Sequence, residues 1–307
     1  MATIPAGQTF CSDLSAQAGE PLIGTATPTR VYLLLEYNGA WGEKALEESD
    51  LPEAVKAHLK AYSKSSRDTK ALLIKRRRDL QETGIGFFVG IVTERDPSLY
   101  AFRLDHYEDI LALDLDKIST GSADVEEHRR DEPMILVCTN GRRDPCCAQK
   151  GVLVLNALSH AVGNCLWESS HVGGHRFAAN LTILPHGLLY GRVDGGNAEM
   201  ILGAYLRGEV HLPNLRGRTC YAPAVQAADY HLRQESGIQA LDAFRLSEVQ
   251  ELSPRRWQVR FVSATSQCYQ LVIAEEKTGA QVYESCLLDK STSITCYDLE
   301  SYSVLSD

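Results

Sequence analysis

The sequence has no run of 18 consecutive apolar residues, which is about the length that a membrane-spanning helix needs. Residues 1–30 are polar and lack the charged start and apolar block of a secretory signal peptide. Basic residues are fewer than acidic ones: the chain has 31 Lys and Arg and 40 Asp and Glu, which gives a formal net charge of −9. Nucleic-acid binders carry the opposite excess. These absences predict a cytoplasmic protein without membrane or nucleic-acid partners.

Several catalytic signatures are also missing. No Cys-x-x-Cys pair occurs, so thioredoxin-type dithiol exchange lacks its two sulfurs. There is no Gly-x-Ser-x-Gly elbow and no phosphate-binding Gly-Lys-Ser/Thr loop. A phosphatase-type loop would need Arg at the position of Asp144, and a zinc-protease helix would need Glu at Val172. Each absence removes one class of enzyme.

Cysteine, in contrast, is abundant: the chain has nine, an odd number. In a reducing compartment we expect free thiols rather than structural disulfides, most of them acting as small buried apolar residues. Cys268, Cys286 and Cys296 have no ligand-like spacing, so we predict that they are buried structural thiols.

The order of predicted elements indicates an α/β fold in three parts. Residues 134–207 predict strand, helix, strand, helix, strand, strand and helix, which is the thioredoxin-like topology. Residues 31–104 show much of the same order and indicate a degenerate thioredoxin-like copy. After a further helix, alternating apolar residues predict a small antiparallel sheet. The expected domains are 1–125, 126–215 and 216–307.

Two charged stretches lie between these elements. The basic run Lys75-Arg76-Arg77-Arg78 is interpreted either as a solvated strand end or as a docking patch for an acidic partner. Residues 119–132 are very polar and predict a linker.

Two clusters of metal-binding residue types follow strands of the predicted central domain. Residues 138–147 read Cys-Thr-Asn-Gly-Arg-Arg-Asp-Pro-Cys-Cys, and residues 171–178 read His-Val-Gly-Gly-His-Arg-Phe-Ala. The glycine pair argues against a helix interior, where each Gly costs about 1 kcal/mol relative to Ala. Two thiolates and two imidazoles complete a tetrahedral zinc site or a [2Fe–2S] site. Spacing alone does not choose between Cys146 and Cys147.

These motifs, together with Trp-Glu-Ser-Ser before the first histidine and Leu-Pro-His-Gly-Leu-Leu-Tyr-Gly-Arg at residues 184–192, resemble the sucrase/ferredoxin-like family. The resemblance covers about residues 134 to 210, and it implies a thioredoxin-like ferredoxin with a bis-histidinyl [2Fe–2S] cluster. It further implies that Cys138 and Cys147 bind one iron and that His171 and His175 bind the other. Cys146 is then a neighbour that does not bind metal.

Such a cluster is formally neutral when oxidised, so it accepts an electron more readily than a cluster with four thiolates. We therefore expect a one-electron carrier or redox sensor with an unidentified redox partner protein. The chain is expected to be a monomer with an internal pseudo-dimer or a homodimer. Two alternatives stay open: a structural zinc-binding interaction domain that uses the same four residues, and an enzyme with Cys138 or Cys147 as nucleophile.

Five further residues are expected around the site. The arginines are interpreted as partners of backbone carbonyls and Asp144, or as cations that stabilise the reduced cluster or dock an acidic partner. The expected neighbours are Cys146, Arg142, Arg143, Arg176 and Asn180.

Overall fold

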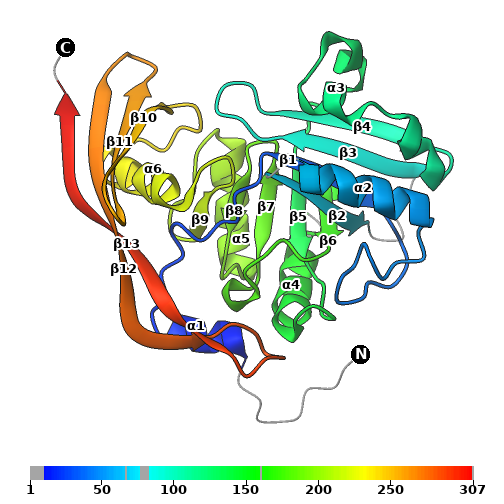
Figure 1. The fold of residues 1–307 in the computed structure, drawn as a ribbon, viewed down its shortest axis with the longest axis horizontal. Helices are drawn as coiled ribbons and strands as arrows, with labels where there is room; N and C mark the ends of the chain where they lie inside the picture. Colours follow the sequence, from blue (N-terminus) through cyan, green and yellow to red (C-terminus); the bar gives the residue numbers. More distant parts are fainter. Residues whose placement is uncertain (1–9, 66–67, 77–82, 160, 306–307) are drawn as a thin grey trace.

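The computed structural model describes residues 10–65, 68–76, 83–159 and 161–305. A nine-stranded mixed sheet with flanking helices forms the larger part, and a separate four-stranded antiparallel sheet stands at one end (Figure 1). The predicted mixed α/β class and the C-terminal antiparallel sheet are therefore confirmed. None of the helices among these residues combines the length and the apolar content needed to cross a bilayer.

The first half of the large sheet has the order β4-β3-β1-β2, in which β1 is parallel to β2 and antiparallel to β3. This confirms the predicted order of strand, helix and three strands. Short helices follow the last strand. The elements are β1 (Val31–Glu36), α2 (Glu53–Ser65), β2 (Thr69–Lys75), β3 (Ile85–Ile91), β4 (Ser98–Leu104), the 3-10 helix Tyr107–Ala112, α3 (Leu115–Ser119) and the 3-10 helix Ala123–His128.

The second half repeats this pairing, because β5 is parallel to β6 and antiparallel to β7, which pairs with β8. A ninth strand extends this half, and a 3-10 turn follows β6. The elements are β5 (Met134–Cys138), α4 (Pro145–Leu158), the 3-10 turn Gly163–Cys165, β6 (Leu166–Ser169), the 3-10 turn His175–Phe177, β7 (Leu181–Leu184), β8 (Leu188–Tyr190), α5 (Gly195–Leu206) and β9 (Leu215–Arg218).

The two halves meet edge to edge through the antiparallel pairing of β2 with β6. One sheet thus contains strands from two of the predicted domains. The division into three domains and the thioredoxin-like assignment stay predictions.

The predicted linker packs against the sheet. Arg130 donates its backbone N–H to the Leu99 carbonyl at 2.7 Å, and Arg129 forms an isolated bridge with Tyr100. Hydrogen bonds therefore tie residues 129–130 to β4, so a free linker is the wrong description. Within the basic run, Arg76 is buried and its guanidinium lies 4.1 Å from the centre of the Trp167 ring, whereas Arg77 and Arg78 lie outside the described residues.

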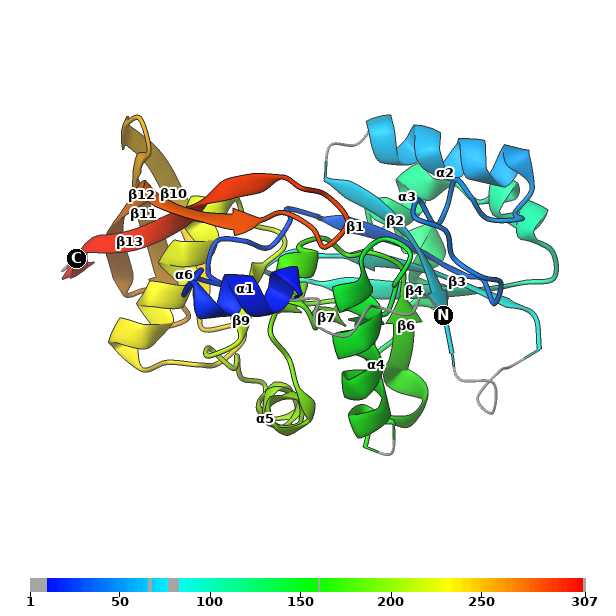
Figure 2. The same cartoon turned by 90° about the horizontal axis from the view of Figure 1, so that it is seen from below.

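The C-terminal part is longer and more regular than expected. It contains α6 (Pro223–Ser236), β10 (Phe244–Ser253), β11 (Arg256–Ser263), β12 (Cys268–Tyr283) and β13 (Ser291–Leu305). The β12–β13 hairpin runs past α1 (Cys11–Gln17) (Figure 2). The end that carries the connecting loop approaches the second half of the large sheet. This loop is part of the site described next.

Candidate metal centre

The expected ligands gather at one edge of the large sheet. β5 ends at Cys138, and its parallel neighbour β6 ends at Ser169, two residues before His171. Because parallel neighbours end at the same edge, the loops that follow them lie close together. The Asp144 side chain caps α4 by accepting the Cys146 N–H at 2.9 Å, and Pro145 occupies the first turn.

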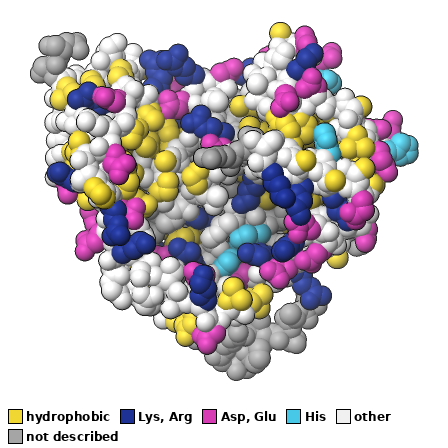
Figure 3. Space-filling view, viewed as in Figure 1, with side chains coloured by type: hydrophobic (Ala, Val, Ile, Leu, Met, Phe, Trp, Pro, Cys, Tyr) yellow, Lys and Arg dark blue, Asp and Glu magenta, His cyan; other side chains and the backbone are white. Residues whose placement is uncertain are grey.

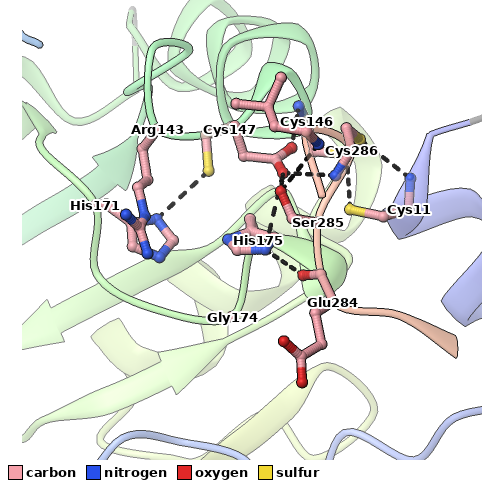
Figure 4. Close-up of polar contacts among 12 residues, drawn as sticks. Cys11, Arg143, Cys146, Cys147, His171, Gly174, His175, Glu284, Ser285 and Cys286 are labelled. Atoms are coloured by element: carbon pink, nitrogen blue, oxygen red, sulfur yellow. Dashed lines mark hydrogen bonds and ion pairs between the residues drawn. The ribbon is translucent and has the colours of Figure 1, made fainter. Parts of the chain in front are cut away.

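Three of the four expected ligands converge. His171 Nδ1 lies 3.7 Å from the Sγ of Cys147 (Figure 4). It lies 3.9 Å from the Sγ of Cys138, and the three atoms lie within 4.8 Å of one another. Both thiols are buried. Hydrogen bonds from Cys147 and His171 hold the pKa of Cys138 below its ordinary value, whereas the same sulfur–sulfur contact raises the pKa of Cys147.

The fourth residue, His175, lies beside this group, with its ring centre 5.3 Å from that of His171. Its Nε2 donates to the backbone carbonyl of Glu284 and lies 3.8 Å from Asp144 Oδ2. Nδ1, on the other side of the ring, is buried without a hydrogen-bond partner. Burial lowers the pKa of His175 and so favours the neutral ring. The Nε2–H tautomer therefore leaves the Nδ1 lone pair free to bind a metal.

The loop between the histidines is fixed by its backbone. Three consecutive carbonyls each accept a hydrogen bond from a side chain of a different element, which holds the loop in one conformation. The bonds are Lys70 Nζ to Val172 O at 2.5 Å, Arg216 Nη1 to Gly173 O at 3.0 Å and Asn180 Nδ2 to Gly174 O at 3.0 Å.

The glycine at position 174 is explained by the same contacts. Gly174 has φ of 72°, and a Cβ atom there would overlap the guanidinium of Arg216. Arg216 is buried and also donates to Asn180 Oδ1 at 2.7 Å. Burial lowers the pKa of Arg216 to about 9. Glycine is needed at position 174 because a buried cation approaches the backbone closely.

The remaining expected neighbours are spread around the site. Arg143 lies next to His171 and pairs with Glu43 at 2.9 Å (Figure 4). Arg142 is exposed, and Arg176 pairs with Glu20 at 2.8 Å.

A pocket of about 330 Å³ gives solvent access to the site. His171 and Arg143 line it, together with Lys60 and Lys70. Figure 3 shows histidine side chains in a hollow of this face, with Lys and Arg side chains around it. His171 is therefore the ligand candidate that faces solvent.

Cys146 points away from this group into a second cluster of sulfurs. Its Sγ lies 3.5 Å from that of Cys11 and 3.2 Å from that of Cys286. The prediction that Cys268, Cys286 and Cys296 are buried is wrong, because all three are partly exposed.

Sequence reasoning missed Lys70, Arg216, Glu284 and the partners of Cys146. The only available signal was the glycine pair, which indicates a close approach but does not name the approaching residue. Cys11 and Cys286 are 135 and 140 residues from Cys146, and no spacing rule spans such distances.

A family model described as sucrase/ferredoxin-like matches residues 22–217, more than half of the chain. The match extends from the segment before β1 into β9 and includes both halves of the large sheet. No curated protein and no solved structure matches the chain.

Proposed function

The chain belongs to the sucrase/ferredoxin-like family, and on that premise we propose that it is a one-electron redox protein, a carrier or a sensor. It holds a [2Fe–2S] cluster through Cys138, Cys147, His171 and His175.

One observation carries the proposal. Two buried sulfurs and His171 Nδ1 converge, and beside them His175 keeps a buried Nδ1 without a partner. A ring nitrogen next to two buried thiols, with its lone pair unused, is a donor that a metal can bind. Thiolate and imidazole together are a donor set that biological [2Fe–2S] centres use.

When bound, the cluster supplies a site that takes up and releases one electron. Two cations lie beside that site. The side chains of Lys70 and Arg216 are fixed there because they donate hydrogen bonds to carbonyls of the loop between the two histidines. Positive charge nearby stabilises the reduced state, which carries one more negative charge than the oxidised state. His171 faces the pocket, whereas the Glu284 carbonyl covers the Nε2 of His175, so electrons pass on the His171 side.

We also propose that both halves of the large sheet are thioredoxin-like and that the first half takes the place of a dimer partner. Two observations support this assignment. The first and second strands of each half pair in parallel, and β2 pairs with β6 where the halves meet. A cytoplasmic location is part of the proposal, since none of the nine cysteines is paired in a disulfide, as a reducing compartment favours.

A structural zinc site that uses the same four residues is the second candidate. It is favoured by the compact arrangement of Cys138, Cys147 and His171, whose donor atoms lie within 4.8 Å of one another. Such a site would stabilise the fold and would not transfer electrons, because Zn²⁺ has no redox chemistry.

Anaerobic purification followed by iron, sulfide and zinc analysis distinguishes the two candidates. The [2Fe–2S] proposal predicts a red-brown protein with two irons and two acid-labile sulfides per chain. A colourless protein with zinc and no iron would support the structural site.

A further inference from the structure

Three thiols from distant parts of the sequence meet beside the candidate centre. Cys11 opens α1, Cys146 lies in the first turn of α4, and Cys286 lies in the loop between β12 and β13. The three sulfurs and a carboxylate oxygen of Asp144 lie within 4.8 Å of one another. Figure 4 shows these side chains grouped on the side of His175 away from His171.

Thiols alone do not explain this grouping. The S–H group is a weak donor and sulfur a weak acceptor, whereas ordering segments 135 and 140 residues apart costs substantial chain entropy. The backbone N–H of Cys11 donates to the Sγ of Cys286 at 3.2 Å, which is a contact that favours a thiolate. Three thiolates at these separations would repel one another, so the three sulfurs can be deprotonated together only around a cation.

The distances fit a metal ion better than a disulfide. Sulfurs at about 2.3 Å from a tetrahedral zinc ion lie about 3.8 Å from each other, whereas a disulfide bond is about 2.05 Å long. The observed separations are 3.5 Å and 3.2 Å. A disulfide would also use two of the sulfurs and leave the third unpaired.

Asp144 is able to supply a fourth donor. Its carboxylate accepts hydrogen bonds from Cys146 N, Ser285 Oγ and Cys286 N, each at 2.9 Å. An ionised carboxylate has about four acceptor positions, so one lone pair is left for a metal.

We propose that Cys11, Cys146, Cys286 and Asp144 form a second metal site that binds Zn²⁺. Three thiolates exclude Ca²⁺ and Mg²⁺, which prefer oxygen ligands, and one carboxylate completes a tetrahedral set. A pocket of about 260 Å³, lined by Cys11, Ser285 and Cys286, gives the ion a path from solvent.

This zinc site ties the β12–β13 loop to α1 and α4. The same loop carries Glu284, whose carbonyl accepts the Nε2–H of His175. The ion therefore holds the C-terminal hairpin against one ligand of the redox centre. The two sites share no ligand, so the zinc site does not depend on the proposed function.

Zinc analysis of the full chain tests this proposal. Cys286→Ser is expected to contain one zinc ion fewer per chain than the wild type, whereas Cys268→Ser, at the start of β12, is expected to keep the wild-type content. The difference of one ion is expected whether the first site holds iron or zinc. Failure of the zinc-site proposal is therefore distinguishable from failure of the proposed redox function. Equal zinc content in Cys286→Ser and wild type would overturn the site.

A second measurement removes the first site altogether. We expect the variant Cys138→Ser/Cys147→Ser to bind one Co²⁺ per chain with a thiolate-to-cobalt charge-transfer band that added Zn²⁺ abolishes. Adding Cys11→Ser to this variant is expected to remove the band. Recovery of the anaerobically purified wild type with its mass reduced by two hydrogens, as a disulfide within the cluster, would contradict the proposal.

Discussion

Asp144 and His175 lie 3.8 Å apart, and the carboxylate of Asp144 belongs to the group of Cys11, Cys146 and Cys286. The same carboxylate caps α4 and holds the backbone of Cys286. One buried side chain thus positions the start of α4, on which Cys146 and Cys147 lie, together with the loop that covers His175. The two adjacent cysteines serve different sites because successive helical residues point about 100° apart.

This geometry predicts opposite outcomes for the two adjacent cysteines. Cys147→Ser is expected to lose the iron and sulfide of the chain and the visible absorption, because it removes a thiolate that faces His171. Cys146→Ser is expected to keep them and to lose zinc. Absorption spectra and metal analysis of the two variants check the assignment. Loss of iron in Cys146→Ser with retention in Cys147→Ser would reverse it.

Gly174→Ala is expected to destabilise the protein through two effects. A non-glycine residue at φ of 72° costs about 1–2 kcal/mol, and the overlap with Arg216 adds about 1–3 kcal/mol. Gly237 has the same φ of 72° but no atom within 4 Å of an added Cβ, so Gly237→Ala is the matched control. Urea unfolding of both variants measures the difference, and equal free energies of unfolding would refute the close approach.

Lys70→Met is expected to lower the reduction potential at pH 7 by an amount on the order of tens of millivolts, because it removes a positive charge that contacts the loop between the two histidines. Lys60→Met is the control, since Lys60 lines the same pocket but is exposed and pairs with Glu47 at 2.6 Å. Protein-film voltammetry measures both. An unchanged potential in Lys70→Met would show that this charge does not act on the centre.

The same lysine predicts how the potential depends on pH. Burial lowers the pKa of Lys70 to about 8, and reduction raises that pKa because it adds negative charge nearby. Below pH 8 the side chain is protonated in both redox states and contributes no slope. Between pH 8 and the higher pKa of the reduced state, reduction takes up a proton, so the potential falls as pH rises, by at most about 60 mV per unit. Lys70→Met is expected to lose this contribution, and an identical pH profile would contradict it.

The pairing of β2 with β6 predicts the oligomeric state. If the first half of the sheet fills the place of a partner, the edge strand of the second half is already covered within one chain. Sedimentation velocity of the metal-loaded protein is expected to show a monomer, and a stable homodimer at micromolar concentration would speak against internal pairing.

Local sequence was enough to predict much of the scaffold. The run at residues 134–137 indicates a buried strand with a helix after it, and the chain forms β5 and α4 there. The alternating residues after 256 predict antiparallel strands, since the side chains of a strand alternate between its two faces. These features depend on neighbours within a few residues, which the sequence shows directly.

The surroundings of the site could not be predicted in the same way. Lys70 and Arg216 reach the histidine loop from other strands or strand ends, and their hydrogen bonds exist only after the sheet has formed. Cys286 was misinterpreted for the same reason, because its partners come from the other end of the chain. Spacing rules describe ligands on one loop or helix and not those brought together by tertiary structure.

Electron paramagnetic resonance of the anaerobically purified chain, after reduction by one electron, tests the central claim most directly. The account predicts a spin-one-half signal of one reduced [2Fe–2S] cluster per chain, with hyperfine couplings to two histidine nitrogens. It further predicts that His171→Ala and His175→Ala each remove one of these couplings. A chain that gives no such signal, or a signal without nitrogen couplings, would contradict the account.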